Sequence, residues 1–332
     1  MYTTSVEMYQ PVGKFGLPVN FTGQCADTLL AQAASKVMEA PELEIRGMKV
    51  RELNNVNFLL NQPQWSIIFN PYRKISLKYL MAEWLWYVSG RQDKEGADFI
   101  AHYASFWNSI RNEDGSLNSN YGYYVFNPMD EVLPTEEEFK PISDYYFQHS
   151  QFDYVIDTLT KDKYSRQAVI NINNVYHKAH PTKDFPCTLA LQFYIREYMG
   201  IPQLCMAVSM RSTDLILGFC NDIFQFSMFQ AMLYHELQKV YPDLWLGYLT
   251  LSTNSLHVYE RHYAMTDKIA MAAVEKPELY FDEETRLNVT HIFDFEYSEF
   301  KSLLNKEELT WRTNNLKDNI KTIFGIDLNE VN

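Results

Sequence analysis

A cysteine and an arginine with complementary chemistry stand in one largely apolar stretch of the sequence. Cys187 lies in the run Asp-Phe-Pro-Cys-Thr, and Arg211 opens the run Arg-Ser-Thr-Asp. A cysteine attacks as its thiolate, and a nearby cation lowers the pKa of the thiol. A guanidinium can also hold a phosphate through two parallel hydrogen bonds. This pair is typical of a nucleophilic site for a small anionic substrate.

The pattern around these two residues predicts that they meet. Residues 189–198 and 203–210 are rich in strand formers and flank a turn at Met199-Gly200. A hairpin around that turn brings Cys187 and Arg211 to its open end. A buried, inert cysteine beside a surface arginine is the plainer alternative, and the pairing leaves the two interpretations evenly matched.

Further polar groups lie where they could assist such chemistry. Glu83 stands in an apolar helical run, where a carboxylate needs a partner or a raised pKa, and such a group suits proton relay. His257 and Tyr259 share one face of a predicted strand and could grip a sugar hydroxyl. The alternative for Glu83 is a glutamate at the edge of a helix. For His257 and Tyr259 the alternative is an ordinary polar strand face, and their spacing alone favours this alternative. Trp107 is either a core residue or a stacking platform.

The surrounding pattern predicts one layered α/β or α+β domain over residues 1–332, with a sheet covered by helices. Residues 1–24 are expected to be an N-terminal arm, 126–150 a surface insertion and 301–332 a tail of helix and loop. The predicted helices are 25–40, 76–90, 151–161, 222–242 and 260–275. The predicted strands are 48–60, 64–69, 167–174, 189–198, 203–210 and 248–259.

Composition narrows the class of protein. The net charge of −13 argues against binding polymeric nucleic acid, which needs a basic surface. The 46% of hydrophobic residues supports a large core, and the 15% of aromatic residues suits a cavity for a flat ligand. The four cysteines show no metal-binding spacing, so we expect no metal and a reducing compartment. We expect a cytoplasmic protein without a membrane segment, since no signal peptide or long apolar run is visible.

From about Arg46 to Phe300 the chain resembles the thymidylate synthase superfamily. The order of several motifs carries this resemblance: Arg46-Gly47, Glu83-Trp84-Leu85-Trp86, Trp107, Asn118-Ser119-Asn120-Tyr121-Gly122, Ser165-Arg166, Pro186-Cys187, Arg211-Ser212-Thr213-Asp214, His257 with Tyr259, and Ile292-Phe293-Asp294-Phe295. The resemblance implies a large mixed sheet covered by helices and a homodimer formed through that sheet. Two positions depart from the family pattern: Gln167 replaces a second arginine, and Thr188 replaces a histidine.

The resemblance also implies a role for each matching residue. Cys187 would be the nucleophile, with Glu83 and Tyr121 moving protons. The phosphate would be held by Arg46, Arg211, Ser212 and Arg166, with Arg166 donated in trans by the partner subunit. His257 and Tyr259 would bind the deoxyribose. Trp107, Asp214 and Gly218 would contact the folate.

A further departure concerns the base of the substrate. The asparagine that reads uracil in the family falls at Asp222, and a protonated aspartate can accept from the cytosine amino group and donate to its ring nitrogen. With the runs Gly218-Phe219-Cys220-Asn221-Asp222 and Ser255-Leu256-His257-Val258-Tyr259, this is similar to the phage deoxycytidylate hydroxymethylases. The family's closing apolar tail is not recognisable at the C-terminus, which would leave the site open to water.

The resemblance therefore implies addition of Cys187 to carbon 6 of dCMP. Carbon 5 would then attack the methylene group of 5,10-methylenetetrahydrofolate, and water would complete 5-hydroxymethyl-dCMP. The alternatives are a dCMP methyltransferase or thymidylate synthase, in which hydride replaces water, and a non-catalytic relative that binds nucleotide or RNA. A phage-encoded enzyme of this kind would work in the host cytoplasm.

Overall fold

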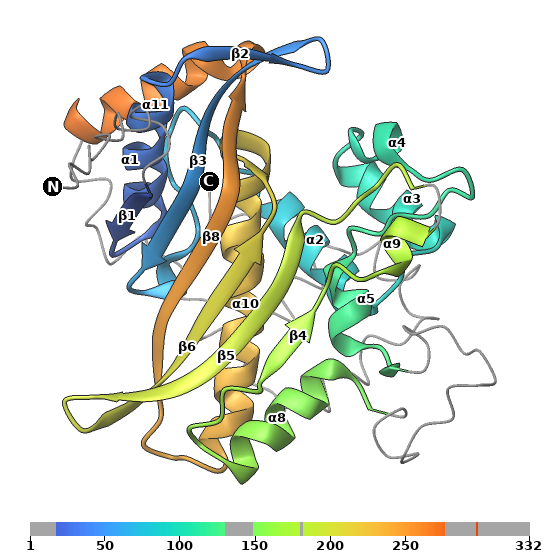
Figure 1. Cartoon of the computed structure of the whole chain (residues 1–332), viewed down its shortest axis with the longest axis vertical. Coiled ribbons are helices and arrows are strands. Elements are labelled where there is room, and N and C mark those ends of the chain that lie inside the picture. Colours follow the sequence, from blue (N-terminus) through green and yellow to red (C-terminus); the bar gives the residue numbers. More distant parts are fainter. Residues whose placement is uncertain (1–17, 130–148, 180–181, 276–296, 298–332) are drawn as a thin grey trace, which may run out of the picture.

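A mixed sheet of eight strands forms the centre of the molecule (Figure 1). The computed structural model describes residues 18–129, 149–179, 182–275 and 297. The main strands follow the order β1-β3-β8-β6-β5-β4, while β2 pairs with β3 and β7 with β8. The bounds are β1 Val19–Gly23, β2 Glu42–Ile45, β3 Met48–Leu60, β4 Val169–Asn171, β5 Thr188–Tyr198, β6 Ile201–Met210, β7 Thr213–Asp214 and β8 Trp245–Tyr259.

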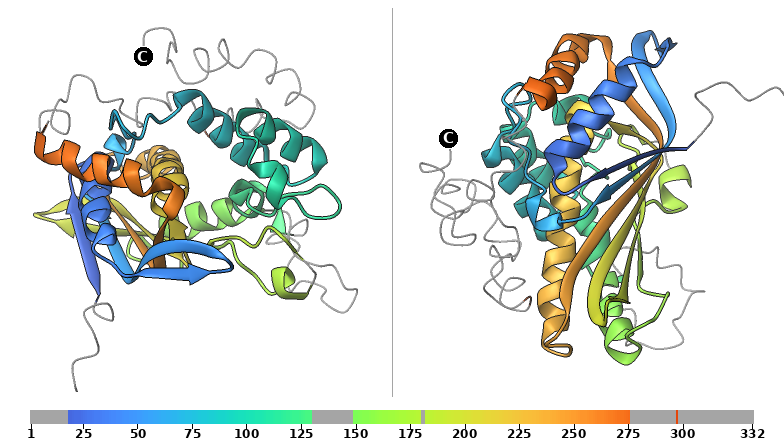
Figure 2. Two further views of the ribbon diagram at one scale, coloured as in Figure 1. Left: turned by 90° about the horizontal axis from the view of Figure 1, so that it is seen from above. Right: turned by 90° about the vertical axis from the view of Figure 1, so that its left-hand side faces the viewer.

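Most of the helices cover one face of this sheet. The helices of the described residues are α1 Ala26–Met38, α2 Leu77–Ser89, α3 Lys94–Tyr103, α4 Trp107–Ile110, α5 Tyr121–Phe126, α8 Gln151–Lys161, α9 Tyr176–Ala179, α10 Cys220–Gln238 and α11 Tyr263–Glu275, with short helical turns η1 Pro63–Trp65, η2 Leu215–Phe219 and η3 Glu260–His262. The two views in Figure 2 place α1, α10 and α11 on the same side of the strands. The predicted mixed sheet with covering helices is thus confirmed.

Several predicted elements match because local sequence signals decide them. The predicted strand 48–60 and helix 151–161 coincide with β3 and α8. The Ser76 hydroxyl caps α2 by accepting from the Tyr79 amide at 3.2 Å, and Gly90 ends it in the left-handed conformation at φ 59°. Met199 and Gly200 both have positive φ, which suits the two-residue turn between β5 and β6.

The strand predicted at residues 64–69 is wrong. Residues 63–65 form η1 and no strand follows, although Ile67 and Ile68 are fully buried. The buried Asp27 carboxylate accepts hydrogen bonds from the Phe69 and Asn70 amides at 2.9–3.1 Å. The backbone there is satisfied by a side chain from α1, so it needs no neighbouring strand.

The predicted irregular arm at residues 1–24 also needs correction within its described part. Val19–Gly23 forms β1, which pairs in parallel with β3. Phe21 faces the core, with its ring 5.3 Å from that of Phe58. The predicted insertion at 126–150, the strand near Phe293 and the tail from 301 fall largely or wholly outside the described residues.

The central helix α10 is buried on nearly every side, so its polar side chains require internal partners. Gln230 donates to the carbonyl of Leu204 at 2.9 Å, and Gln225 donates to the carbonyl of Leu80 at 3.0 Å. These bonds fix α10 against the sheet and against α2. The N-terminal turn of α10, which contains Asp222, consequently lies beside Glu83 of α2.

Candidate active site

The predicted hairpin brings Cys187 and Arg211 together. Thr188 pairs with Met210 across β5 and β6, and the Arg211 amide donates to the Cys187 carbonyl at 2.9 Å. The Arg211 guanidinium donates to the carbonyls of Pro186 and Phe185 at 3.1 and 2.7 Å. The arginine therefore holds in place the loop that carries the nucleophile.

Arg211 keeps donors for an anion while it clamps this loop. Its third bond goes to the Ser212 hydroxyl at 3.1 Å, so these three bonds occupy only part of the guanidinium's five N–H donors. The side chain is exposed and its charge lies 5.4 Å from the centre of the Phe185 ring. A phosphate can approach this cation from solvent.

Burial opposes the expected ionisation of Cys187. It raises the pKa of the thiol, and Arg211 and Ser212 offset only part of that effect. The nearby carboxyls of Asp222 and Asp184 raise the pKa further. Arg211 lowers the pKa of the thiol as predicted, but desolvation has the larger effect. The sulfur lies 3.8 Å from the Ser212 hydroxyl.

Glu83 is buried in α2 with only 4% of its surface exposed. It accepts from the Tyr79 hydroxyl at 2.8 Å and from the Gln225 amide at 3.1 Å. Burial raises its pKa to about 7, against the lowering effect of both bonds. A carboxyl with a pKa near neutrality can both take up and release protons, as the proton-relay hypothesis requires.

Trp107 belongs to the same network. Its indole N–H donates to the Tyr79 hydroxyl at 3.1 Å, and its ring meets that of Trp86 edge-on at 5.1 Å between centroids. The Trp107 side chain is largely buried, with 6% of its surface exposed.

Asp222 lies in the first turn of α10, in surroundings that favour its protonated form. The residue is not fully buried, yet desolvation of its carboxyl raises the pKa well above the usual range, and the charge of Glu83 raises it further. A hydrogen bond from Thr213 works in the opposite direction. In its protonated form the Asp222 carboxyl is both a donor and an acceptor.

A π-helical turn positions the start of α10. The Asp214 carboxylate accepts from the amides of Ile216 and Leu217 at 2.7 and 2.9 Å, while its other oxygen is buried without a protein partner. The Arg73 side chain donates to the Ile216 carbonyl at 2.8 Å and fixes the turn from outside. Such turns frequently occur at functional sites, and this one supplies a free acceptor.

Gly218 is required within this turn by close packing. A Cβ at this position would lie 2.7 Å from the Thr213 hydroxyl and 3.4 Å from an Asp222 carboxyl oxygen. Any larger residue would therefore displace the groups around Asp222. Gly218 was predicted to contact folate, and the structure shows that it also has a packing role.

Tyr121 begins α5 and is 5% exposed. Burial raises the pKa of its hydroxyl, and the charges of Cys187 and Asp222 raise it further. Because such effects fall off with distance, they place the phenol near both groups. The predicted grouping of Cys187, Tyr121 and Asp222 is thus found in one region.

His257 and Tyr259 project from the same face of β8. Their rings meet edge-on with centroids 5.2 Å apart, and the Arg261 guanidinium lies 4.9 Å from the centre of the Tyr259 ring. His257 stands beside Asp214 in the parallel β7–β8 pair. Burial lowers the pKa of His257, so its imidazole is neutral at neutral pH.

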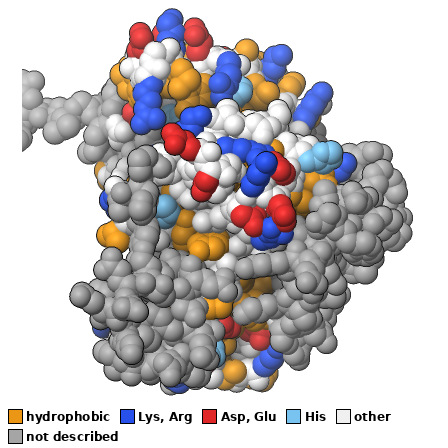
Figure 3. All heavy atoms as spheres, turned by 90° about the vertical axis from the view of Figure 1, so that its right-hand side faces the viewer, with side chains coloured by type: hydrophobic (Ala, Val, Ile, Leu, Met, Phe, Trp, Pro, Cys, Tyr) orange, Lys and Arg blue, Asp and Glu red, His pale blue; other side chains and the backbone are white. Residues whose placement is uncertain are grey.

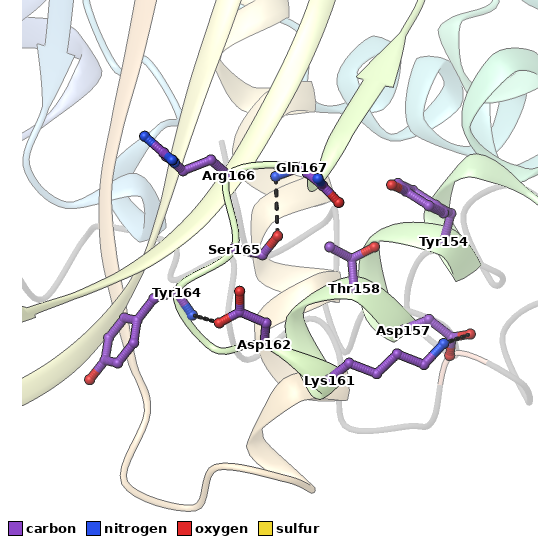
Figure 4. Close-up of a pocket in the computed structure, with 9 residues that line it drawn as sticks. All are labelled: Tyr154, Asp157, Thr158, Lys161, Asp162, Tyr164, Ser165, Arg166 and Gln167. Carbon is purple, nitrogen blue, oxygen red and sulfur yellow. Dashed lines mark hydrogen bonds and ion pairs between the residues drawn. The ribbon is translucent and has the colours of Figure 1, made fainter.

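Arg46 and Arg166 lie on other segments than Cys187. Burial raises the pKa of Tyr259, and the charge of Arg46 acts in the opposite direction. Arg46 is exposed at the tip of the β2–β3 hairpin. The Arg166 carbonyl accepts from Gln192 of β5, which is five residues from Cys187 or roughly 17 Å along an extended strand. Figure 4 shows the Arg166 side chain pointing away from Lys161 and Asp157, at the edge of a hollow of about 590 Å³.

Sequence reasoning missed a buried aspartate three residues before the nucleophile. Asp184 is 4% exposed and accepts from the Ser119 amide and hydroxyl at 2.6 and 2.5 Å. Its carbonyl accepts from the Asn118 side chain at 2.8 Å. These bonds join the Cys187 loop to the segment before Tyr121. The only hint of these bonds in the sequence is the polar run Asn118-Ser119-Asn120, which offers donors for a buried carboxylate.

The described surface around α3 carries charges of both signs. Arg91 pairs with Asp93 and Glu95, and Arg111 pairs with Asp98. Figure 3 shows basic and acidic side chains interspersed on this face. Across the described ranges no group of His, Cys, Asp and Glu has a metal-binding arrangement, and no helix there is both long and apolar enough to cross a membrane.

Comparison with known proteins identifies the family. Residues 31–307 match the sequence model of the family described as Thymidylate synthase. The chain belongs to the thymidylate synthase family. The match covers most of the sequence and includes Glu83, Cys187, Arg211 and Asp222. The protein is accordingly an enzyme of a family that transfers one-carbon units to pyrimidine nucleotides.

Relatives within the family have different activities. Deoxycytidylate 5-hydroxymethyltransferase of Enterobacteria phage T4 is 26% identical over 235 residues, covering 67% of this chain and 80% of the relative. Deoxyuridylate hydroxymethyltransferase of Bacillus phage SP01 is 26% identical over 265 residues, covering 73% and 59% respectively. Thymidylate synthase A from Bacillus subtilis shares the fold with a TM-score of 0.56 at 18% identity, over 73% of this chain and 83% of that one.

We predict that Glu83→Gln changes how stability depends on pH. The pKa of about 7 in the folded protein lies above the ordinary glutamate value of 4.5, so the folded wild type holds this proton more tightly than the unfolded chain. Its stability relative to Glu83→Gln should fall by about 3 kcal/mol as pH rises from 5 to 9. Denaturant unfolding at several pH values measures this difference.

Measuring stability at several pH values separates the effect of the raised Glu83 pKa from the effect of altered packing. In Glu83→Gln the new amide can meet the Gln225 amide donor-to-donor, which lowers stability by a similar amount at every pH. The exposed variant Glu95→Gln supplies the control. A constant gap between wild type and Glu83→Gln across the range would contradict the raised pKa.

Proposed function

We propose that the protein is a deoxycytidylate hydroxymethyltransferase, which converts dCMP, 5,10-methylenetetrahydrofolate and water to 5-hydroxymethyl-dCMP and tetrahydrofolate. The observation that carries this proposal is the Asp222 carboxyl near Cys187 and Tyr121, where burial raises its pKa and so favours its protonated form. The similarity to the T4 enzyme that acts on deoxycytidylate supports the same conclusion.

The proton on Asp222 matches the edge of cytosine. Cytosine presents an amino donor next to an unprotonated ring nitrogen, whereas uracil presents a carbonyl acceptor next to a ring N–H. A neutral carboxyl accepts from the amino group through its carbonyl oxygen and donates to the ring nitrogen through its hydroxyl. An ionised carboxylate would only accept and would leave that nitrogen unpaired. Burial beside Glu83 thus supports selection of cytosine.

We assign roles to the remaining residues from the resemblance to the family. Cys187 adds to carbon 6 of the base, and Glu83, Tyr121 and ordered water exchange protons with the ring. Because the thiol is protonated at rest, attack requires its proton to leave as the base binds. Arg211 and Ser212 bind the phosphate at the open end of the hairpin, and His257 with Tyr259 binds the sugar.

The folate fits the free acceptor in the π-helical turn. The buried Asp214 oxygen without a protein partner suits the N–H groups of a pterin ring. Trp107 would present its ring to the cofactor, and Gly218 keeps the turn close to Asp222. The bound folate supplies the one-carbon unit.

We infer a homodimer in which Arg166 of each chain serves the site of its partner. Its separation of roughly 17 Å from Cys187 along β5 supports a role in trans. The sheet face opposite the helices offers a surface for pairing, with hydrogen bonds of 2.7 and 3.1 Å linking Ser252, Asn57 and Asn20. Arg46, at the tip of its hairpin, would close over the phosphate.

One incubation tests this function. We expect purified protein given methylenetetrahydrofolate to convert dCMP, and not dUMP, into a product whose mass exceeds that of the methylated nucleotide by one oxygen atom. Mass spectrometry of the nucleotides measures both the base and the group added. A methyl product would reassign the enzyme as a methyltransferase, and turnover of dUMP alone would remove the role given to Asp222.

A further inference from the structure

A carboxylate that the proposed reaction does not use stands next to the sugar-binding histidine. Glu52 on β3 is the cross-strand partner of His257 on β8. Ser255 lies two residues before His257 and shares its face of the strand. The Ser255 hydroxyl donates to the Glu52 carboxylate and lies 3.4 Å from Nδ1 of His257.

The single proton of Ser255 determines the direction of this chain of contacts. A carboxylate can only accept, so the short contact with Glu52 uses the hydroxyl proton. Ser255 then has only lone pairs to offer to His257, and Nδ1 must carry the hydrogen. Since a neutral imidazole has one N–H, Nε2 is left as an acceptor.

The surroundings of His257 support a neutral ring. Burial lowers the pKa of His257, and Arg211 adds to this effect. Asp214 and Glu52, which flank the ring from the two neighbouring strands, and a hydrogen bond with the Ser255 backbone favour the charged form, but burial outweighs them. A contact of 3.4 Å is long for an N–H···O bond. Its main consequence is therefore the choice of tautomer and not a large gain in stability.

We propose that Glu52 is a positioning residue that, through Ser255, holds His257 in the Nδ1–H tautomer and so makes its Nε2 the acceptor for the sugar hydroxyl of the substrate. The second half of this inference rests on the proposed function. A deoxynucleoside 5′-monophosphate has one free sugar hydroxyl, at the 3′ position, and this tautomer recognises it as a donor. Substrates without a 3′ donor should be discriminated against.

The tautomer can be measured without substrate. In ¹⁵N-labelled protein, long-range proton–nitrogen correlation distinguishes Nδ1–H from Nε2–H, and loss of the signal in His257→Gln assigns it. We expect the Nδ1–H pattern in the wild type. Glu52→Gln introduces amide donors, which free the Ser255 proton to turn toward Nδ1, so the Nε2–H form should appear. Glu44→Gln, on the exposed strand β2, is the matched control and should leave the pattern unchanged.

A substrate comparison tests the second half. Wild type should prefer dCMP over 2′,3′-dideoxycytidine monophosphate in kcat/KM. Glu52→Gln should reduce that preference by about three- to tenfold, as expected for one weakened hydrogen bond, and Glu44→Gln should preserve it. An Nε2–H pattern in the wild type, or an unchanged tautomer in Glu52→Gln, would overturn the role of Glu52. If the wild type converts neither nucleotide, the proposed function and the substrate half fail together, while the nitrogen spectra alone decide the tautomer.

Discussion

Replacing Cys187 with alanine is expected to abolish conversion of dCMP, with kcat reduced by about four orders of magnitude or more. The proposed route needs a covalent bond between the Cys187 sulfur and carbon 6 of the base to make carbon 5 nucleophilic. No hydroxyl or amine replaces the sulfur in this variant. Single-turnover assays with dCMP and methylenetetrahydrofolate measure the loss, and mass spectrometry of the denatured wild type during turnover should reveal the nucleotide adduct.

Cys205→Ala supplies the matched control for this experiment. Cys205 lies buried in β6, and its thiol donates to the Gln203 carbonyl. The substitution removes the same atoms from the same sheet, away from the hairpin end that carries Cys187. Turnover by Cys205→Ala should remain near that of the wild type. Undiminished turnover by Cys187→Ala would exclude covalent catalysis by this residue.

Local sequence patterns predicted the frame of this site well. The strand β3, the helix α8 and the cap and end of α2 follow from periodicity and terminal signals that act over a few residues. The meeting of Cys187 with Arg211 followed from one hairpin turn at Met199-Gly200. The predictions were correct where the interactions that determine an element join residues close together in the sequence.

The errors and omissions involve partners that are distant along the chain. Asp27 satisfies the amides of Phe69 and Asn70 more than forty residues away, which removes the need for the predicted strand. The bond between Asp184 and Ser119 spans 65 residues. No local pattern contains such contacts.

Electrostatics set a second limit on the sequence-based interpretation. The cation beside Cys187 was predicted correctly, but the balance between its charge and the desolvation of the thiol depends on how deeply the sulfur is buried. At Asp222 burial and a neighbouring carboxyl also raise the pKa, and there the shift favours the protonated form that the hypothesis requires. The residue types show which groups can ionise, but the packing around each group determines the direction of its pKa shift.

Asp222→Asn is expected to invert the preference for base, changing the ratio of kcat/KM for dCMP to that for dUMP by about 10²- to 10⁴-fold. An asparagine donates through its amide to a carbonyl and accepts from a ring N–H, which matches uracil. An amide held in that orientation would set its donor against the cytosine amino group and its acceptor against the bare ring nitrogen, which leaves buried groups unpaired unless the amide turns over. Competition assays with both nucleotides measure the ratio.

The charge change itself is not the cause of this expected inversion. Because burial favours the protonated, neutral form of Asp222, Asp222→Asn alters mainly the pattern of donors and acceptors and not the net charge of the site. Asp243→Asn makes the same substitution at an exposed loop position and should leave the ratio unchanged. A variant that loses activity on both nucleotides equally would show that Asp222 supports the chemistry without choosing the base. A gain on dUMP with a loss on dCMP requires that the proton on this carboxyl is what the enzyme uses to recognise cytosine.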